Sequence, residues 1–399
     1  MQNARQVLIH ISGPDKAGVT AGLCQVISQT AAQLVDIGQT VLHGHLALSA
    51  IVEIPPGSDT LHQVLEHVSK LGLRMELGDV QSIEKPSKHV AGSLSLTLMG
   101  ELSDSKALAE CTKFLATENL NLREIKALSC EALNGIEIIA DLEGAKSIEA
   151  DRFQSLRADL YALASKLGVD IAAQRENVFR RNKRMICMDV DSTFVPGECI
   201  NILGELHGCG EEIAKVTKAA MEGKMNFEQA LRERVSKLKG LSLKTAQERM
   251  SQEAPLEQTQ QMVKAFRTLG LKVGVVSGGF DFFVDELKSK YNLDFAFANK
   301  LTVKNGVFTG ELEGEIITAE RKAEVLSHMA QAYDCPLQQT VAVGDGANDI
   351  PMLKLAGLGI AFHAKRSVQE QADTRLNCSN LESILYLLGY KQSEIRDLI

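Results

Sequence analysis

A short apolar run gives way to carboxylates and hydroxyls at residues 185–193, which read MICMDVDST. Two further runs change in the same way: residues 273–279 read VGVVSGG, and residues 341–349 read VAVGDGAND. Continuous apolar runs of this length are typical of strands that are buried on both faces of a parallel sheet. Ligands of open α/β sheets bind just beyond the carboxyl ends of such strands. We therefore expect the polar ends of these runs to converge on one site.

Asp189 and Asp191 lie two residues apart at the end of the first run. Side chains at this spacing on a strand project the same way, so both carboxylates can face one phosphate group. Because two carboxylates would repel a phosphate dianion, we expect a divalent cation between them, and oxygen ligands of this kind suit Mg²⁺. Asp345 supplies a further carboxylate from the third run. We expect Asp189 to attack phosphorus and form an aspartyl-phosphate.

Asp191 is the expected general acid, and later the base. An alkoxide is a poor leaving group, so a proton must arrive as the P–O bond breaks, and positioned proton transfer contributes about 10²–10⁴-fold. A carboxyl with an ordinary pKa of about 3.9 would be mostly ionised at neutral pH, so the site must raise the pKa of Asp191. The alternative is that residues 191–193 only cap a helix. One Asp-x-Asp would not exclude capping, but three polar strand ends together favour catalysis.

The remaining polar residues suit a phosphoryl group. Ser277 and Gly278 offer a hydroxyl and main-chain amides at a helix start, although Ser-Gly-Gly alone is a common turn. Lys322 lies on an expected helix, and its ammonium would offset the charge of a pentacoordinate transition state. A helical lysine by itself is usually solvated. We expect Asn348 to bind the phosphoryl group with these residues, and Asp349 to orient Lys322 or the water around the ion.

Residues 183–399 resemble the haloacid dehalogenase superfamily of phosphotransferases. The motifs that carry the resemblance, in the order of that superfamily, are Asp189-x-Asp191-x-Thr193, Ser277-Gly278-Gly279, Lys322 and Gly344-Asp345-Gly346-Ala347-Asn348-Asp349. The resemblance implies an α/β fold, with a Rossmann-like parallel sheet and a small helical cap at about residues 197–262. It also implies that Asp191 binds Mg²⁺ through its main-chain carbonyl, beside Asp189 and Asp345.

The segment between the first two motifs resembles the branch of this superfamily that hydrolyses phosphoserine. It reads PGE at 196–198, TKAAMEG at 217–223 and FEQALRERV at 227–235. The resemblance implies that Glu198 binds the substrate ammonium, that Arg234 binds the substrate carboxylate, and that Met221 and Phe227 wall the pocket. A planar guanidinium suits bidentate binding of a carboxylate. Without the resemblance, a surface ion pair at Arg234 and core packing of the two apolar residues would be the plainer interpretations.

The reaction that this resemblance implies is hydrolysis of O-phospho-L-serine to L-serine and phosphate, the last step of serine biosynthesis. Two alternatives stay open. A hydrolase or mutase for another phosphorylated metabolite would share the core without needing Glu198 and Arg234 as a pair. An amino-acid sensor with an inert catalytic domain is the other, and the intact Asp189, Asp191 and Lys322 argue against inertness.

Two βαββαβ units are expected ahead of this region, in residues 1–84 and 89–175. The first is expected to have strands at 7–11, 36–42, 46–54 and 74–80, and helices at 19–34 and 61–71. The second is expected to have strands at 93–99, 120–127, 136–142 and 169–174, and helices at 105–118 and 148–167. The repeat lies in the order of elements more than in residue identity.

Both units resemble ACT domains, which bind amino acids and usually pair their sheets side by side. The loop after the first strand of such domains often reads Asp-x-x-Gly, which Asp15 and Gly18 match here. Glycine lets main-chain amides approach a ligand carboxylate. When the units are aligned through Gly13 and Gly100, Ser105 replaces Gly18 in the second. We expect a homodimer through these units and L-serine as an effector; the alternative is that they serve only as a scaffold.

The composition excludes several other classes of protein. The 399 residues carry a formal net charge of −8 and only 5% aromatic residues, which disfavours nucleic-acid binding. Eight cysteines without a CxxC pair indicate reduced thiols in the cytoplasm rather than a disulfide framework or a zinc site. No apolar stretch reaches the roughly 20 residues of a membrane span. Residues 84–88 and 175–184 are the expected connectors, the second a solvated basic linker before a phosphatase domain at 183–399.

Overall fold

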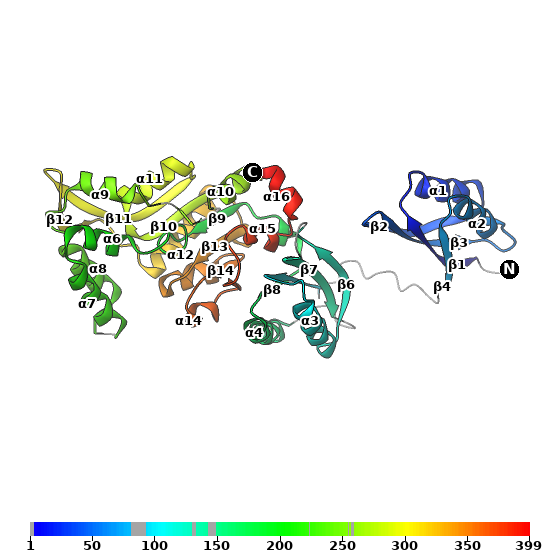
Figure 1. The fold of residues 1–399 in the computed structure, drawn as a ribbon, viewed down its shortest axis with the longest axis horizontal. Coiled ribbons are helices and arrows are strands. Elements are labelled where there is room, and N and C mark those ends of the chain that lie inside the picture. The colour runs from blue at the N-terminus through cyan, green and yellow to red at the C-terminus, as the bar shows by residue number, and fades with distance from the viewer. Residues whose placement is uncertain are drawn as a thin grey trace. The chain divides into compact units, whose positions relative to one another are not determined.

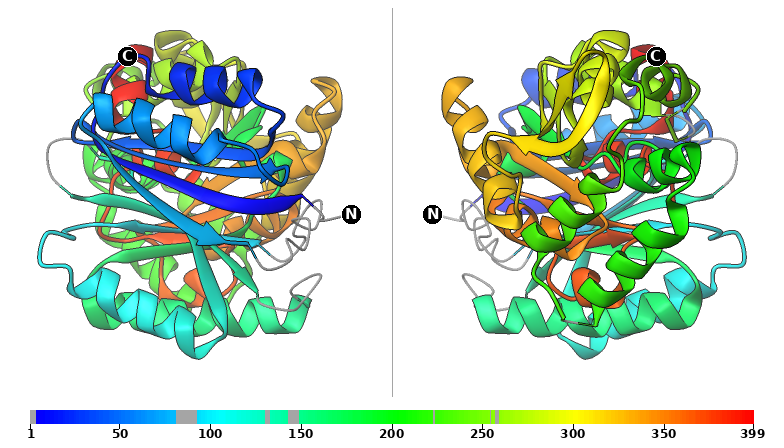
Figure 2. Two further views of the ribbon diagram at one scale, coloured as in Figure 1. Left: turned by 90° about the vertical axis from the view of Figure 1, so that its right-hand side faces the viewer. Right: turned by 90° about the vertical axis from the view of Figure 1, so that its left-hand side faces the viewer.

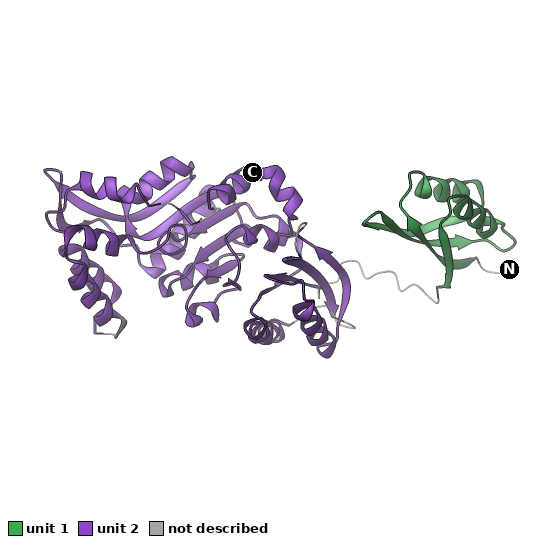
Figure 3. Cartoon of the chain, viewed as in Figure 1, with its two compact units in different colours: residues 1–89 green, residues 90–399 purple. Residues whose placement is uncertain are grey.

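The computed structural model describes residues 4–80, 93–129, 133–142, 149–222, 224–253, 255–256 and 259–399. The chain divides into two compact units, Met1–His89 and Val90–Ile399 (Figure 3). The expected connector at 84–88 lies outside the described residues. Within the described ranges, no helix combines the length and the apolar character that crossing a membrane requires.

The first unit contains one four-stranded antiparallel sheet in the order β2-β3-β1-β4. Its elements are β1 Arg5–Pro14, α1 Val19–Gln29, β2 Gln33–Leu42, β3 His45–Ile54, α2 Thr60–Lys70 and β4 Arg74–Asp79. Buried and more exposed residues alternate along β1, because successive side chains point to opposite faces of a sheet. Val7, Ile9 and Ile11 form a core with apolar residues of α1 and α2, so both helices cover one face.

The helix expected at 19–34 is shorter than its apolar spacing indicated. It ends at Gln29, and Thr30 already has an extended backbone. Gln33 and Leu34 instead pair with Glu53 and Val52 of β3. The prediction was wrong here because the hydrogen bonds of the sheet outweigh a helical periodicity that weakens after Ile27.

The second sheet opens the other unit and repeats the order of the first, as β6-β7-β5-β8. Its elements are β5 Ser93–Met99, α3 Lys106–Thr117, β6 Leu120–Ala127, β7 Gly135–Leu142, α4 Ala150–Leu167 and β8 Asp170–Arg175. Figure 2 shows α3 and α4 together on one face of this sheet, and their apolar residues share a core with Leu94, Leu96 and Leu98. The expected succession of two βαββαβ sheets is confirmed in its element order.

The opposite face of the second sheet packs against the rest of its own unit. All seven residues of β5 are buried. Met99 of β5 and Ala172 of β8 belong to the same apolar core as Ile384 and Leu385, near the chain's end. The sheet is therefore covered on both faces along β5 and β8, while most residues of the edge strand β6 are exposed or partly buried.

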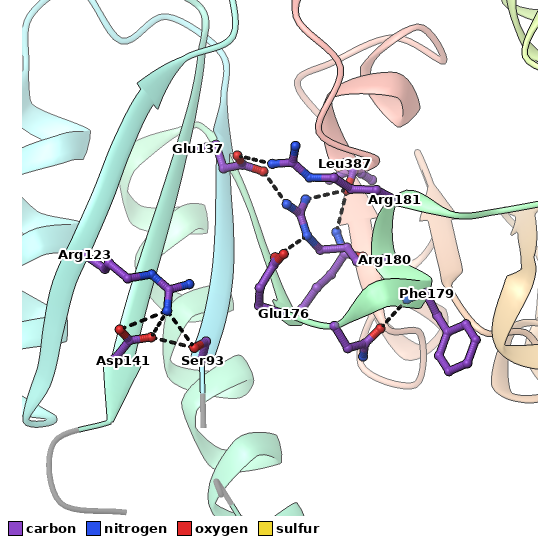
Figure 4. A network of polar contacts seen from close by, with 11 residues as sticks. Ser93, Arg123, Glu137, Asp141, Glu176, Phe179, Arg180, Arg181 and Leu387 are labelled. Carbon is purple, nitrogen blue, oxygen red and sulfur yellow. Dashed lines mark hydrogen bonds and ion pairs between the residues drawn. The ribbon is translucent and has the colours of Figure 1, made fainter. Parts of the chain in front are cut away.

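The basic segment expected to be a solvated linker is partly buried, so that prediction was wrong. It forms the short helix α5 Val178–Arg181, and Arg180 is only 2% exposed. The guanidinium of Arg180 lies 2.7 Å from Oε1 of Glu137 on β7 and 2.5 Å from Oε2 of Glu176 (Figure 4). Arg181 contacts the second oxygen of Glu137 at 3.0 Å. Burial is tolerated here because the charges are paired.

The phosphatase-like part is built on a seven-stranded sheet in the order β12-β11-β10-β9-β13-β14-β15. All neighbours in it are parallel except β11 and β12. The strands are β9 Met185–Met188, β10 Lys272–Phe280, β11 Phe295–Lys304, β12 Val307–Glu313, β13 Thr340–Gly344, β14 Gly359–Phe362 and β15 Thr374–Leu376. Residues of β9 and β13 are buried throughout, as the continuous apolar runs predicted, which confirms the α/β fold with a Rossmann-like parallel sheet.

Helices fill the connections of this sheet. The first four after β9, α6 Cys199–His207, α7 Gly210–Met221, α8 Phe227–Ser236 and α9 Leu243–Met250, gather near β12 in Figure 1. The others are α10 Thr259–Thr268, α11 Asp281–Tyr291, α12 Ala319–Ala332, α13 Ile350–Leu355, α14 Arg366–Gln369, α15 Ser383–Leu387 and α16 Gln392–Leu398, with 3₁₀ turns at Leu337–Gln339 and Ala347–Asp349. The expected helical cap at about 197–262 falls on the first group.

Candidate active site

The three polar strand ends lie at one edge of the parallel sheet. Strand β9 stands between β10 and β13, and Met188 pairs with Val275 and with Val343. The residues that follow these positions open into a cavity of about 430 Å³. Its lining comprises Asp189, Asp191, Glu198, Ile200, Thr217, Ala220, Met225, Phe227, Ala230, Leu231, Arg234, Gly278, Gly279, Phe280, Asp345, Gly346, Ala347 and Asn348. The convergence that the sequence predicted is present.

Asp189 is held on one of its two oxygens. Its Oδ1 accepts a hydrogen bond of 2.8 Å from the main-chain N–H of Val190 and lies 2.7 Å from Nζ of Lys322. Lys322 also lies 2.7 Å from Oδ1 of Asp349. Burial lowers the pKa of Lys322, but Asp189 and Asp349 together raise it above its ordinary value. The lysine is therefore a charged group inside the protein and not the solvated helical lysine of the plainer interpretation.

Asp191 accepts a hydrogen bond on each of its carboxylate oxygens. Its Oδ1 accepts a hydrogen bond of 2.8 Å from the N–H of Cys199, and Ser277 Oγ donates to its Oδ2 at 3.3 Å. Burial, with the charge of Glu198 adding to it, raises the pKa of Asp191 to about 7. The side chain can thus hold a proton near neutral pH, which an ordinary aspartate would not do.

Asp345 completes a cluster of acids. Carboxylate oxygens of Asp189, Asp345 and Asp349 lie within 4.8 Å of one another. Burial and the charges of Asp349 and Glu198 raise the pKa of Asp345 to about 6. Its Oδ1 accepts a hydrogen bond of 3.4 Å from Thr193, a contact that the sequence did not predict. Several carboxylates facing one ammonium leave an excess of negative charge.

The irregular end of β10 at Ser277–Gly279, which we call the Ser277–Gly279 turn, lies directly against Asp191. Gly279 N–H donates to Ser277 Oγ at 2.8 Å, and a Cβ built on Gly279 would lie 3.0 Å from Asp191 Oδ2. Gly278 lines the cavity, where a Cβ would stand 3.7 Å from the ring of Phe227 and 3.9 Å from Nδ2 of Asn348. The turn is therefore a close-packed wall of the cavity and not a surface loop.

The cap brings charged and apolar residues over the same cavity. Glu198 precedes α6, and Arg234 and Phe227 lie on α8. Burial lowers the pKa of Arg234, while Glu198 and Asp191 act in the opposite direction. Met225 also lines the cavity, which the sequence did not single out. The side chain of Met221 lies outside what the structure describes, so its predicted role stays a prediction.

The predicted regulatory residues lie in the other unit. Asp15 and Gly18 are exposed in the turn between β1 and α1, and Asp15 N–H donates to the carbonyl of Gly44 at 2.8 Å. Gly18 has φ +96°, a left-handed backbone that disfavours side chains. Ser105 precedes α3 with φ +59°, so the same backbone region is used in the second sheet despite the different residue.

Comparisons with known proteins identify relatives of both the N-terminal and the C-terminal part of the chain. The family model for the ACT domain matches residues 5–80, and that for haloacid dehalogenase-like hydrolases matches residues 186–354. A phosphoserine phosphatase of Streptomyces coelicolor is 35% identical over 98% of this chain and 93% of the relative. The chain belongs to the phosphoserine phosphatase family.

Further members of this family support the assignment. Phosphoserine phosphatase SerB2 of Mycobacterium tuberculosis is 34% identical over 98% of this chain and 94% of the relative. The structure of a probable phosphoserine phosphatase from Vibrio cholerae, in an unliganded form, aligns with a TM-score of 0.58 at 29% identity, over 79% of this chain and 92% of that one. The predicted class of enzyme, a phosphatase of the haloacid dehalogenase type joined to an ACT domain, is confirmed.

Proposed function

We propose that this chain hydrolyses O-phospho-L-serine to L-serine and phosphate, the last step of L-serine biosynthesis. The observation that carries the proposal is one cavity lined by Asp189, Asp191, Glu198 and Arg234. The aspartates suit a phosphoryl group, while a carboxylate and a guanidinium suit the α-ammonium and α-carboxylate of an amino acid. We place the reaction in the cytoplasm, since the described cysteines are free thiols.

The acids of this site fit a magnesium ion. Asp189, Asp345 and the main-chain carbonyl of Asp191 would hold it, with Asp349 close by and bound to Lys322. Carboxylate and carbonyl oxygens are the ligands that Mg²⁺ prefers, and one ammonium does not balance the carboxylates that meet here. When bound, the ion would supply positive charge to the phosphoryl oxygens.

The first half-reaction uses Asp189 as the nucleophile. Lys322 and Val190 hold its Oδ1, so we assign the attack on phosphorus to Oδ2. The bond from phosphorus to the serine oxygen breaks as the aspartyl-phosphate forms, and Asp191 transfers its proton to that oxygen.

Other residues orient the phosphoryl group during this step. Ser277, Gly278 and Asn348 would bind its oxygens, and the ammonium of Lys322 would offset the charge that builds up in the transition state. Phe227, and Met221 from the same cap, would exclude water from the pocket.

The second half-reaction reverses the role of Asp191. Now ionised, it removes a proton from water, and the water oxygen attacks phosphorus to release phosphate and regenerate Asp189. A pKa near neutrality serves both halves, because the group must be protonated in one and ionised in the other.

We further propose three domains, at residues 1–84, 89–175 and 183–399, with L-serine as an effector bound near Asp15 and Gly18. A homodimer through the ACT-like domains is supported by β2, which is exposed along its length. Its exposed large apolar residues are Leu34, Val35, Ile37, Val41 and Leu42. Calorimetry with L-serine and light scattering of the full chain would test these proposals; no heat of binding would refute the effector.

Phosphate release from a panel of phosphomonoesters tests the reaction. Phosphoserine with Mg²⁺ should be the preferred substrate over phosphothreonine and sugar phosphates, and a chelator should abolish turnover. Asp189→Asn should fold yet lose activity by at least about 10⁴-fold, as expected when a nucleophile is removed. Glu198→Gln and Arg234→Lys should mainly raise KM for phosphoserine. An inactive wild-type enzyme would favour the sensor alternative, and a preference for another metabolite would favour the related hydrolase.

A further inference from the structure

We propose that Asn299 is a positioning residue of the phosphatase reaction, which holds the Ser277–Gly279 turn in the shape that receives the phosphoryl group. Asn299 lies on β11, beside β10, and is 1% exposed. Its Nδ2 donates to the carbonyl of Gly278 at 2.8 Å and to that of Gly279 at 3.3 Å. Its Oδ1 accepts from the N–H of Ile317 at 2.8 Å. The side chain thus makes hydrogen bonds with main-chain groups of two separate segments.

The turn needs such a partner because β10 leaves the regular ladder there. Val276 pairs with Phe297, and the next pair joins Phe280 to Asn299, so β10 has three residues between paired positions where β11 has one. Extra residues in one strand bulge out and lose their ladder partners. Buried carbonyls without a partner are costly. The amide of Asn299 donates to the carbonyls of Gly278 and Gly279 in this irregular stretch.

The held segment is the part of β10 that touches the chemistry. Ser277 Oγ donates to Asp191 Oδ2, Gly278 lines the cavity, and Gly279 packs against the carboxylate of Asp191. A displacement of about 1 Å in a catalytic site can cost about 10²-fold in rate. Rotation of the Gly278 or Gly279 peptide would therefore misplace both the phosphoryl-binding amides and the general acid.

The hydrogen bond from Ile317 to Asn299 connects this side chain to the segment just before α12, the helix that carries Lys322. Ile317 immediately precedes Thr318, whose side chain caps α12 by accepting from Arg321 N–H. Lys322 lies in the first turns of that helix and contacts Asp189. One buried amide thus fixes the spacing between the Ser277–Gly279 turn and the start of the helix that carries Lys322. Asn299 follows the short apolar run at 295–298, but that position does not indicate which main-chain groups its amide contacts.

Two substitutions separate positioning from folding. Asn299→Asp keeps the shape and the acceptor for Ile317, but it replaces the donors with a carboxylate that faces two carbonyls. Asn299→Ala removes all three hydrogen bonds. The matched control is Thr309→Val on β12, which removes a 3.2 Å hydrogen bond to the carbonyl of Thr302 on β11 without touching the turn.

The measurements are kcat, KM and the inhibition constant of inorganic phosphate, alongside thermal unfolding followed by circular dichroism. Both Asn299 variants should lower kcat by about 10-fold to 100-fold and weaken phosphate inhibition, since they misplace donors aimed at the phosphoryl group. Thr309→Val should keep kcat within about twofold of the wild type. A lower melting temperature with unchanged kcat and phosphate inhibition would overturn the proposal, as would failure of both variants to fold.

The inference rests on the proposed function. A second substrate distinguishes failure of the inference from failure of the proposed function. All constants are measured with phosphoserine and with p-nitrophenyl phosphate, which carries a phosphoryl group but neither an ammonium nor a carboxylate. A wild type that cleaves only p-nitrophenyl phosphate would refute the amino-acid substrate, while loss of that activity in the Asn299 variants would still support positioning.

Discussion

The two βαββαβ sheets have one strand order but differ in what covers the face away from their helices. Along β1 every second residue is only partly buried, whereas all seven residues of β5 are buried. Pairing makes the comparison residue by residue: His10 lies opposite Glu76, and the corresponding Thr97 lies opposite Ala172. Glu76 is exposed and Ala172 is 0% exposed. The same strand order therefore occurs in one sheet whose second face is partly exposed and in another whose second face packs against the catalytic core.

Hydrogen bonds between the second sheet and the catalytic part of its unit have no counterpart at the position compared in the first sheet. Asp170 accepts hydrogen bonds from the N–H groups of Asn377 and Cys378, and Gln174 donates to the carbonyl of Leu387 at 2.9 Å. The residue that corresponds to Asp170 in the first sheet is Arg74, which is exposed. Charged groups that are solvated in one sheet are replaced in the other by groups that bind main chain.

Exchanging residues between the two faces should give the largest effect. Ala172→Glu places an unpaired charge in the core that β8 shares with the catalytic sheet, and we expect it to lower the free energy of unfolding by about 4–5 kcal/mol. Glu76→Ala, the reciprocal change on an exposed position, should change it by less than about 0.5 kcal/mol. Urea unfolding followed by circular dichroism measures both, since the chain has no Trp. Equal effects of the two changes would contradict the difference between the faces.

The buried ion pair should come next. Glu137→Ala leaves Arg180 buried without its partner on β7, so we expect the free energy of unfolding to fall by about 3 kcal/mol. The phosphatase activity that remains after heating should fall as well. The corresponding residue of the first sheet is Ser49, which contacts His10 at 3.0 Å. Ser49→Ala should cost about 0.5 kcal/mol or less. If Glu137→Ala is as mild as Ser49→Ala, the network of Figure 4 does not hold the sheet in place.

The pH dependence of catalysis should depend on one unit alone. The pKa of Asp191 is raised to about 7, so its acid form is present below that pH and is lost above it. We expect kcat/KM for phosphoserine to fall about tenfold per pH unit above about pH 7. Glu76→Ala should leave this profile unchanged. Glu198→Gln removes a charge that raises the pKa, so the falling limb should move to lower pH; a shift to higher pH would contradict the assigned role of Asp191.

The smallest effects are expected at the turns before the first helices. Gly18→Ala forces a side chain into a left-handed backbone and should destabilise the first unit by about 1 kcal/mol. Ser105→Gly relieves the same strain in the second sheet and should stabilise it by up to about 1 kcal/mol. Unfolding curves of the two variants test this. If both variants change the free energy of unfolding in the same direction, the two turns are not equivalent.

Much of the catalytic half could be predicted from the sequence. Asp189, Ser277 and Asp345 each follow an apolar run directly, and parallel strands bring their carboxyl ends to one edge, so local order along the chain was sufficient. The roles of Asn299 and Thr193 could not be predicted in this way, although Asn299 also follows a short apolar run. Their partners are main-chain groups or side chains that lie far away in the sequence. The basic segment around Arg180 was misread for the same reason, since its acidic partner on β7 lies 43 positions away.

By itself the sequence determined the parallel sheet, its polar edge and the two repeated units, because apolar runs and alternation act over a few neighbouring residues. Only the tertiary structure decided which faces stay in contact with water. Residues 93–99 read SLSLTLM, an alternation typical of a strand with one solvated face, yet Ser95 and Thr97 are buried on the side of the catalytic core. A period of two distinguishes two faces of a strand, but it cannot tell solvent from a protein surface that accepts small polar side chains.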